Sequence, residues 1–333
     1  MMFKITAYGV RSNEVSYFND LNKNQYELNL IGDLLTHENV ETAKGSDAVL
    51  LRANCVADAT NLAKFNEWGI KYVFTRTVGF NHIDLKAAAS YNMKVARVPA
   101  YSPYAVAELA MTLGMMSLRH TTLATSRAED GDFTVAPALF SREVHSSTVG
   151  IIGTGKIGAT EASLYKGMGT RVLGYDPYPS DFARQFVTFV DLDKLLAESD
   201  IVSIHVPYFP GQNENMVDED FLKKMKNDAV LVNTARGELV DHGAVLQALQ
   251  TNTLGSFATD VLPDEKLIFG HQFSGELPNK IVESLRELYP RVLMTPHMGS
   301  YTKPALTDMI AVSYQNFEQV LANGHTDNDV KLD

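Results

Sequence analysis

Three ionisable residues of different types follow apolar runs in the second half of the sequence. Arg236 follows AVLVNTA, Glu265 follows SFATDVLPD and His297 follows RVLMTP. Such apolar runs are typical of strands in a parallel sheet, and ligands bind outside the carboxyl ends of these strands. We therefore expect the three side chains to line one ligand-binding crevice.

These residue types together suit acid–base chemistry on a carbonyl group that lies next to a carboxylate. Histidine is the natural proton donor near neutral pH for an oxygen that becomes an alkoxide. A carboxylate against the other ring nitrogen fixes the tautomer of the ring, and an arginine can bind a substrate carboxylate through two parallel hydrogen bonds. We expect Arg236, Glu265 and His297 to be catalytic because they occur together, since each residue type alone is more often an ordinary surface or loop residue.

A glycine motif earlier in the chain predicts a dinucleotide site. Gly153, Gly155 and Gly158 form a G-x-G-x-x-G pattern that follows the strand-like run TVGII, and the next such run, RVLGYD, ends in Asp176. The glycines permit a tight turn and let backbone N–H groups approach a pyrophosphate at a helix N-terminus. Asp176 would bind the ribose hydroxyls and repel a 2′-phosphate, so we expect NAD as the cofactor. The alternative is a glycine turn that only packs a helix on the sheet.

Strand-like and helix-like segments alternate along the chain, which is typical of parallel α/β sheets. In the N-terminal third we expect strands at residues 4–9, 26–31, 47–52, 70–77 and 94–99, with short helices at 41–45, 61–69 and 84–92. A second series of strands is expected at 147–153, 170–176, 200–206, 228–235, 255–260 and 291–296. The sequence therefore predicts two α/β units.

Two further helices are predicted where the units join. Ser102 and Pro103 are a favourable N-cap and first helical residue, and the helix expected at 104–119 is apolar on almost every side. Such a helix must be buried against the domains or against a second subunit. The last helix, at 302–323, carries an apolar face that we expect to pack back on the first domain. The domains would be 1–101 plus 300–333, and 102–299.

Composition excludes several classes of partner. Hydrophobic residues make up 45% and charged residues 21% of the chain, as in folded globular proteins. The formal net charge of -11 argues against nucleic acid, so local cations must capture any anionic substrate. We find no apolar run long enough for a membrane span, and no signal-peptide pattern. The single cysteine fits the reducing cytoplasm, and no metal site is expected.

Several motifs resemble those of the D-isomer-specific 2-hydroxyacid dehydrogenases. The segments are TRTVGFNHID, VPAYSPYAVAE, TVGIIGTGKIG, SDIVSIHVP, LVNTARGELVD, ATDVLPDE and TPHMGSYT. The resemblance extends from end to end and is greatest to the D-lactate and (R)-2-hydroxyglutarate dehydrogenase branch. It implies a flavodoxin-like substrate-binding domain and an NAD-binding Rossmann domain, with a cleft between them and hinges near residues 101–102 and 299–300. It also implies a homodimer joined through the nucleotide domain.

The activity implied by this resemblance is the reversible, NAD-dependent reduction of a 2-oxo acid to the D-2-hydroxy acid. Arg236 would orient the substrate carboxylate, and His297, partnered by Glu265, would be the acid/base. Backbone groups of Val78 and Gly79 would also contact the carboxylate. The substrate side would be completed by Arg52, Tyr101, Ser300 and Tyr301. Besides the glycines, the cofactor side would comprise Lys156, Ile157, Asp176, Val206, Pro207, Asn213, Thr234, Ala235, Arg236 and Asp260.

Two positions depart from the lactate-specific pattern. An aromatic residue stands at the position of Arg52 in those relatives and a phenylalanine at the position of Ser300, whereas LRANC here is similar to the LRGNC-like motif of the 2-hydroxyglutarate dehydrogenases. A cation inside a pocket needs an anionic partner, which a second substrate carboxylate would supply. We therefore expect 2-oxoglutarate as the substrate. If Arg52 turns to solvent or pairs with a protein acid, pyruvate is expected instead.

Other functions fit the same fold. A broad-range dehydrogenase would act on larger 2-oxo acids such as phenylpyruvate. A corepressor that senses NAD is an alternative of another class, since C-terminal-binding proteins resemble this family. We expect such a protein to carry peptide-docking features and long disordered ends, which this sequence does not show. Formate dehydrogenases also resemble the family, but they place glutamine where Glu265 stands.

Overall fold

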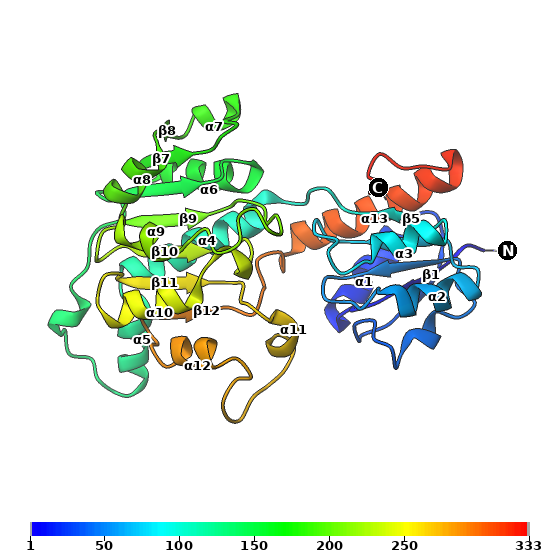
Figure 1. The fold of residues 1–333 in the computed structure, drawn as a ribbon, viewed down its shortest axis with the longest axis horizontal. Helices are drawn as coiled ribbons and strands as arrows, with labels where there is room; N and C mark the ends of the chain where they lie inside the picture. Colours follow the sequence, from blue (N-terminus) through cyan, green and yellow to red (C-terminus); the bar gives the residue numbers. More distant parts are fainter. Residues whose placement is uncertain (1, 332–333) are drawn as a thin grey trace. The chain divides into compact units, whose positions relative to one another are not determined.

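The computed structural model describes residues 2–331 and contains two compact units (Figure 1). The first unit runs to Ser102 and resumes at Tyr301, and the second comprises Pro103–Ser300. Each unit holds one sheet whose strands are all parallel. The predicted α/β fold class is confirmed.

The first unit is built on a five-stranded sheet of order β2-β1-β3-β4-β5. Its strands are β1 (Lys4–Ala7), β2 (Glu27–Leu30), β3 (Ala48–Leu51), β4 (Tyr72–Thr75) and β5 (Lys94–Ala96). Its helices are η1 (Ser12–Glu14), α1 (Val15–Leu21), η2 (Val40–Ala43), α2 (Ala59–Glu67), α3 (Leu85–Ser90) and α13 (Lys303–Asn323). All five strands lie within the predicted segments. The helix predicted at 41–45 is a short 3-10 helix at Val40–Ala43, and the chain leaves the helical conformation at Gly45, which adopts φ 81°.

The C-terminal helix α13 covers one face of this sheet (Figure 1). Phe317 stacks on Phe74 with ring centroids 4.6 Å apart, and the Tyr314 hydroxyl donates to the Phe18 carbonyl oxygen at 2.8 Å. Helices α2 and α3 cover the opposite face. The prediction that the last helix packs on the first domain is therefore confirmed.

The second unit is built on a seven-stranded sheet of order β12-β11-β10-β9-β6-β7-β8. Its strands are β6 (Thr148–Ile152), β7 (Arg171–Tyr175), β8 (Thr188–Phe189), β9 (Ile201–Ile204), β10 (Val230–Asn233), β11 (Ser256–Thr259) and β12 (Val292–Met294). Its helices are α4 (Pro103–Leu118), α5 (Thr121–Glu129), η3 (Pro137–Leu139), α6 (Lys156–Gly167), α7 (Asp181–Arg184), α8 (Leu192–Glu198), α9 (Glu219–Lys223), η4 (Gly237–Leu239), α10 (His242–Gln250), α11 (Glu265–Ile268) and α12 (Lys280–Arg286). Six strands lie in the predicted segments, and the two-residue edge strand β8 was not predicted.

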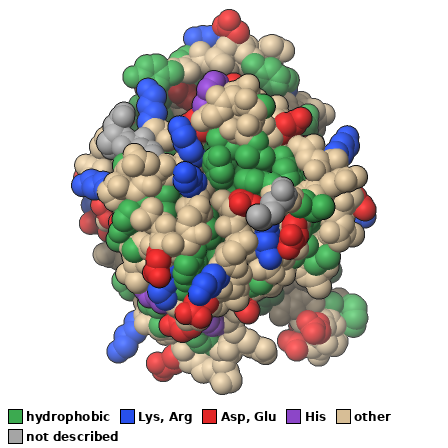
Figure 2. Space-filling view, turned by 90° about the vertical axis from the view of Figure 1, so that its right-hand side faces the viewer, with side chains coloured by type: hydrophobic (Ala, Val, Ile, Leu, Met, Phe, Trp, Pro, Cys, Tyr) green, Lys and Arg blue, Asp and Glu red, His purple; other side chains and the backbone are tan. Residues whose placement is uncertain are grey.

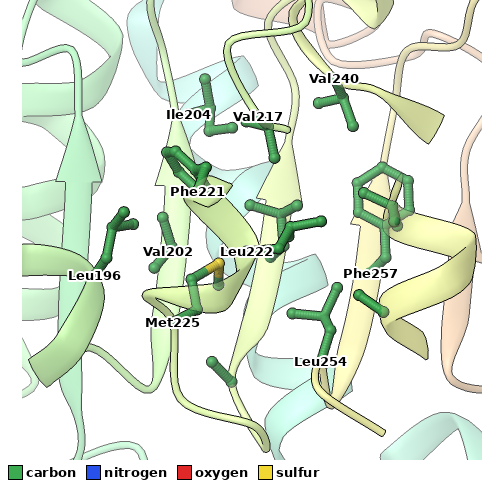
Figure 3. Close-up of a cluster of buried hydrophobic side chains, with 14 of the residues drawn as sticks. Leu196, Val202, Ile204, Val217, Phe221, Leu222, Met225, Val240, Leu254 and Phe257 are labelled. Atoms are coloured by element: carbon green, nitrogen blue, oxygen red, sulfur yellow. The ribbon is translucent and has the colours of Figure 1, made fainter. Parts of the chain in front are cut away.

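Apolar side chains fill both faces of this second sheet. On one face, Leu196 of α8 and Phe221 of α9 pack over Val202 and Phe257 of the strands (Figure 3). On the other face, α4 and α6 pack against each other and on the sheet. The apolar helix α4 is thus buried largely within its own unit.

Two findings bear on the predicted location of the protein. None of the helices formed by residues 2–331 is long and apolar enough to cross a membrane. Cys55 is buried in the core of the first unit. The cytoplasmic location stays a prediction.

Candidate active site

The three predicted catalytic residues follow three adjacent strands of the second sheet. Arg236 follows β10, Glu265 opens α11 after β11, and His297 follows β12. Strands β10, β11 and β12 pair in parallel in this order. Their carboxyl ends therefore meet at one edge, where an open parallel sheet binds ligands.

His297 and Glu265 contact each other directly. The His297 Nδ1 atom lies 2.8 Å from Oε2 of Glu265, and both side chains are partly buried. Phe269 packs its ring against the imidazole with centroids 6.2 Å apart. Nε2 of His297 has no hydrogen-bond partner in the part of the chain that the structure describes. This geometry leaves Nε2 available for proton transfer to a ligand.

The loop that carries His297 is held by Asp260, at the end of β11. The Asp260 carboxylate accepts hydrogen bonds from the Thr295 hydroxyl at 2.6 Å and from the N–H groups of Met298 and Gly299, both at 2.8 Å. Burial raises the pKa of Asp260, and these hydrogen bonds oppose that effect. Asp260 was predicted to bind the cofactor, and the structure places it as a brace for the loop that presents His297.

Arg236 lies in a loop organised by Asn233. The Asn233 amide donates to the Arg236 carbonyl oxygen at 2.9 Å and accepts from the Ala235 N–H at 3.0 Å. The Arg236 guanidinium donates to the Ala235 carbonyl oxygen at 2.6 Å, and no carboxylate among residues 2–331 lies within 4.0 Å of it. An arginine in this state can bind an anionic ligand. Asn233 was not predicted from the sequence, although asparagine at a strand end is a common turn former.

Each glycine of the G-x-G-x-x-G motif has a distinct steric role. Gly153 adopts φ 86°, and a Cβ atom there would lie 2.8 Å from the carbonyl carbon of His205. A Cβ at Gly158 would lie 2.1 Å from the Gly153 oxygen. A Cβ at Gly155 would meet nothing within 4 Å. Gly153 and Gly158 therefore allow close packing, whereas Gly155 leaves open space beside the N-terminus of α6, as a pyrophosphate requires.

Asp176 follows β7, and its carboxylate contacts the glycine loop. It accepts hydrogen bonds from the Thr154 N–H at 2.7 Å, from the Thr154 hydroxyl at 3.1 Å and from the Tyr178 N–H at 2.8 Å. A carboxylate has about four acceptor positions, so one remains for a ligand hydroxyl. Asp176 thus lies where the ribose of a dinucleotide on this loop would be expected.

Val206 and Pro207 follow β9, the neighbour of β6 on the side opposite β7. Asn213 closes the loop that they begin. Its side chain accepts from the Phe209 N–H and donates to the Pro207 carbonyl oxygen, both at 2.7 Å. Both polar groups of Asn213 are therefore engaged in shaping the loop.

The remaining predicted cofactor residues lie at the ends of β10 and α6. Lys156 and Ile157 are the first residues of α6, and Thr234 and Ala235 follow β10. The Thr234 hydroxyl is buried and has no hydrogen-bond partner among the described residues. Buried hydroxyl groups are normally paired, so this one indicates a missing ligand contact. Together with the open space at Gly155, it shows that the site fits a dinucleotide.

In the first unit, Val78 and Gly79 follow β4. The Val78 carbonyl oxygen accepts from the Arg97 guanidinium at 3.0 Å, and the Gly79 carbonyl oxygen accepts from the Thr77 hydroxyl at 2.8 Å. The N–H groups of Val78 and Gly79 have no acceptor within residues 2–331. These two donors can therefore bind a carboxylate.

Three other predicted substrate residues lie at the ends of the two units. Tyr101 lies just before the end of the first segment, Ser300 is the last residue of the second unit, and Tyr301 follows it. The Tyr301 hydroxyl donates to Asn13 at 2.8 Å, within the first unit. Substrate contacts of these residues stay predictions.

Arg52 follows β3 and is partly buried. Its guanidinium has no hydrogen-bond or ion-pair partner in the described part of the chain. Burial, together with the positive charges of Arg11 and Arg76, lowers the pKa of Arg52 to about 10. Arg52 is still protonated at neutral pH. It therefore presents a positive charge that no acidic side chain of residues 2–331 neutralises directly.

Comparison with known proteins gives the family. Residues 111–299 match the family described as D-isomer specific 2-hydroxyacid dehydrogenase, NAD binding domain. The chain is 35% identical to the D-lactate dehydrogenase of Lactiplantibacillus plantarum, over 99% of this chain and 100% of that protein. The chain belongs to the D-isomer-specific 2-hydroxyacid dehydrogenase family. It is therefore an enzyme, an NAD-dependent D-2-hydroxyacid dehydrogenase, as the sequence motifs predicted.

Other relatives of this dehydrogenase differ in their named substrates. It is 31% identical to an aromatic 2-oxoacid reductase of Clostridium sporogenes, over 98% of each chain. A crystal structure of the NAD complex of a D-isomer specific 2-hydroxyacid dehydrogenase from Lactobacillus delbrueckii ssp. bulgaricus is similar, with a TM-score of 0.85 and 36% identity over 98% of this chain and 100% of that one. The predicted cofactor, NAD, is thereby confirmed.

Proposed function

We propose that this dehydrogenase reduces 2-oxoglutarate to (R)-2-hydroxyglutarate and catalyses the reverse reaction. The observation that supports this substrate is the charged, partly buried guanidinium of Arg52, which has no protein partner among residues 2–331. The second carboxylate of 2-oxoglutarate would neutralise it, whereas pyruvate ends in a methyl group at this position. Pyruvate and D-lactate are the competing substrate pair, since several relatives are named D-lactate dehydrogenases.

Arg236 would bind the carboxylate next to the reacting carbonyl group, because its guanidinium lacks a carboxylate partner in the described structure. The free N–H groups of Val78 and Gly79 would add two hydrogen bonds to the same carboxylate. A bidentate arginine fixes the plane of the carboxylate and polarises the adjacent carbonyl group. These contacts would orient the substrate for stereospecific reduction.

His297 would be the general acid for reduction. Its Nε2–H donates a proton to the carbonyl oxygen as that oxygen becomes an alkoxide. Its Nδ1–H donates to Glu265, which holds the ring in the orientation that directs Nε2 to the substrate. In the reverse reaction, Nε2 accepts the proton of the substrate hydroxyl. NADH supplies the hydride when it is bound.

The cofactor would be held by the glycine loop and its neighbours. Backbone N–H groups at Gly155 and Lys156 would bind the pyrophosphate at the N-terminus of α6. The free acceptor position of Asp176 would bind the adenosine ribose, and its charge would repel a 2′-phosphate. The unpaired Thr234 hydroxyl would gain a partner.

The test is a comparison of kcat/KM for 2-oxoglutarate, pyruvate, phenylpyruvate and 2-oxoisocaproate, measured by NADH oxidation. Arg52→Leu should lower kcat/KM for 2-oxoglutarate by roughly 10- to 200-fold, as expected for loss of a charge-assisted hydrogen bond, and should affect pyruvate much less. Lys86→Leu is the matched control, because Lys86 is exposed on α3. The proposal is wrong if the unaltered enzyme prefers pyruvate or phenylpyruvate tenfold or more.

We also propose that the enzyme is a homodimer joined through the second unit. Between α5 and β6, the chain exposes three large apolar side chains, Phe133, Val135 and Phe140, at 82%, 92% and 90% of their surface. Exposed apolar groups gathered on one segment are typical of interfaces. Sedimentation equilibrium should give a dimer, and the triple serine variant should sediment as a monomer. A monomeric unaltered enzyme would contradict the proposal.

A further inference from the structure

Three arginines occupy one edge of the five-stranded sheet in the first unit. Arg11 follows β1, Arg52 follows β3 and Arg76 follows β4, and these strands are adjacent in the order β1-β3-β4. The carboxyl ends of adjacent parallel strands meet at one edge, so the three guanidinium groups lie near one another. The lowered pKa of Arg52, to which both other arginines contribute, agrees with this arrangement.

This concentration of positive charge stands out in an acidic protein. The chain carries a formal charge of -11, and Figure 2 shows a face on which Lys and Arg side chains are interspersed with Asp and Glu. Charges that repel one another are costly to hold together unless an anion compensates them. The arginine cluster (Arg11, Arg52 and Arg76) therefore needs a nearby anion to offset the repulsion between its charges.

Glu14 is the one carboxylate within 4.0 Å of the arginine cluster in the described part of the chain. Arg76 donates to Glu14 at 2.9 Å and to the Gly9 carbonyl oxygen at 2.6 Å, and Arg76 and Glu14 are 2% and 1% exposed. Arg11 donates to the other Glu14 oxygen at 3.1 Å. Three positive charges and one negative charge leave the cluster two positive charges in excess.

Arg11 is held in a fixed orientation by Tyr301. Its guanidinium carbon lies 4.1 Å from the centroid of the Tyr301 ring, and the Tyr301 hydroxyl is itself held by Asn13. A guanidinium stacked on an aromatic ring keeps the N–H groups at its edge available. The side chain of Arg11 stays 36% exposed. Arg11 is therefore oriented in advance and accessible to a ligand.

Gly9 allows Arg52 to lie close to the β1 loop that carries Arg11. A Cβ atom at Gly9 would lie 3.1 Å from Cδ of Arg52 and 2.9 Å from a methyl group of Leu34, and Gly9 adopts φ 67°. A larger residue would displace the Arg52 side chain. The β1 loop thus holds two arginines together, Arg11 stacked on a ring and Arg52 without a hydrogen-bond or ion-pair partner among residues 2–331.

We infer that Arg11 is a second specificity-determining residue, which binds the distal carboxylate of a dicarboxylic 2-oxo acid together with Arg52. The inference rests on the proposed function, since it names the residues that would select a dicarboxylate. Each guanidinium donates to the distal carboxylate, which neutralises one of the two excess charges. The buried Arg76–Glu14 pair braces the loops, and Tyr301 is a positioning residue for Arg11.

The test compares 2-oxoglutarate with 2-oxopentanoate, which has the same five-carbon chain but ends in a methyl group. In Arg11→Gln, KM for 2-oxoglutarate should rise about tenfold, as expected for the loss of one charge-assisted hydrogen bond, while kcat changes little. Both parameters for 2-oxopentanoate should stay within twofold. Arg11→Lys should recover part of the affinity, because it retains the charge but not the planar stacking.

Two further variants separate this inference from the proposed function. Tyr301→Leu should raise KM for 2-oxoglutarate in the same direction as Arg11→Gln, and Lys86→Gln should leave it unchanged. If the unaltered enzyme does not prefer 2-oxoglutarate to 2-oxopentanoate, the proposed function fails. If Arg52→Leu abolishes that preference and Arg11→Gln retains it, the proposed function stands and the role of Arg11 is refuted. Equal losses on both substrates in Arg11→Gln would also refute that role and make Arg11 structural.

Discussion

The Nδ1 atom of His297 lies 2.8 Å from Oε2 of Glu265, although 32 positions separate the two residues in the chain. Each residue lies in a turn that contains a left-handed backbone conformation. His297 itself adopts φ 51°, and Asp264, which precedes Glu265, adopts φ 56°. Left-handed conformations are uncommon for residues other than glycine and cluster at functional sites. The pair is thus formed by two constrained loops, one of which Asp260 anchors.

The first prediction concerns the proton donor. His297→Ala should lower kcat for 2-oxo acid reduction by roughly 10²- to 10⁴-fold, because the alkoxide loses its general acid. The dissociation constant of NADH, measured by fluorescence titration, should hardly change, since other residues hold the cofactor. His271→Ala replaces an exposed histidine of the same unit and should leave both quantities unchanged. A His297 variant that retains more than a third of kcat would exclude this residue from proton transfer.

The second prediction concerns the partner of His297. Glu265→Gln retains an oxygen that can accept from Nδ1–H but loses the negative charge that stabilises a positively charged imidazole. The alkaline limb of the pH profile of kcat/KM for reduction should therefore move to lower pH. Glu276→Gln, at an exposed carboxylate, should leave the limb in place. An unmoved limb in Glu265→Gln would mean that this carboxylate only orients the ring.

The strands and the catalytic pair could be predicted because their signals are local. Each strand is an apolar run, and Glu265 and His297 follow such runs directly. The arginine cluster was not predicted, because its arrangement depends on residues that are distant in the sequence. Arg76 is buried only because Glu14, 62 residues earlier, folds against it, and no local pattern reports this contact. The contacts of Asp260 with the His297 loop were not predicted either, because its three donors come from a loop that follows the next strand, and its contact with the cofactor stays a prediction.

The third prediction concerns the choice between NAD and NADP. Asp176→Asn keeps a side-chain oxygen for the Thr154 N–H but removes the charge that repels a 2′-phosphate. The ratio of kcat/KM for NADH to that for NADPH should therefore fall. Thr154→Val removes only the hydroxyl contact to Asp176 and should leave this ratio unchanged, which separates charge from loop support. Equal use of both cofactors by the unaltered enzyme would contradict the role of Asp176.

His242 is a buried histidine outside the proposed chemistry. It opens α10, is 6% exposed, and packs its ring edge-on to Phe257 with centroids 6.0 Å apart. Its Nε2 atom is buried and has no hydrogen-bond partner in residues 2–331. Burial lowers the pKa of His242 to about 4, because the charged ring would lose its hydration. The folded enzyme therefore holds this ring in its neutral form.

The last prediction follows from this shift. Above pH 6.5, the ring is neutral in both the folded and the unfolded chain, and its full contribution to stability is present. As the pH falls towards 4, His242 binds a proton in the unfolded chain but not in the folded chain. The free energy of unfolding should therefore fall by roughly 3 kcal/mol. In His242→Leu this loss should disappear, as measured by urea unfolding at pH 7.5 and pH 4.5. His271→Leu should behave like the unaltered enzyme. An equal loss of unfolding free energy at pH 4.5 in all three proteins would show that protonation of His242 does not destabilise the folded enzyme.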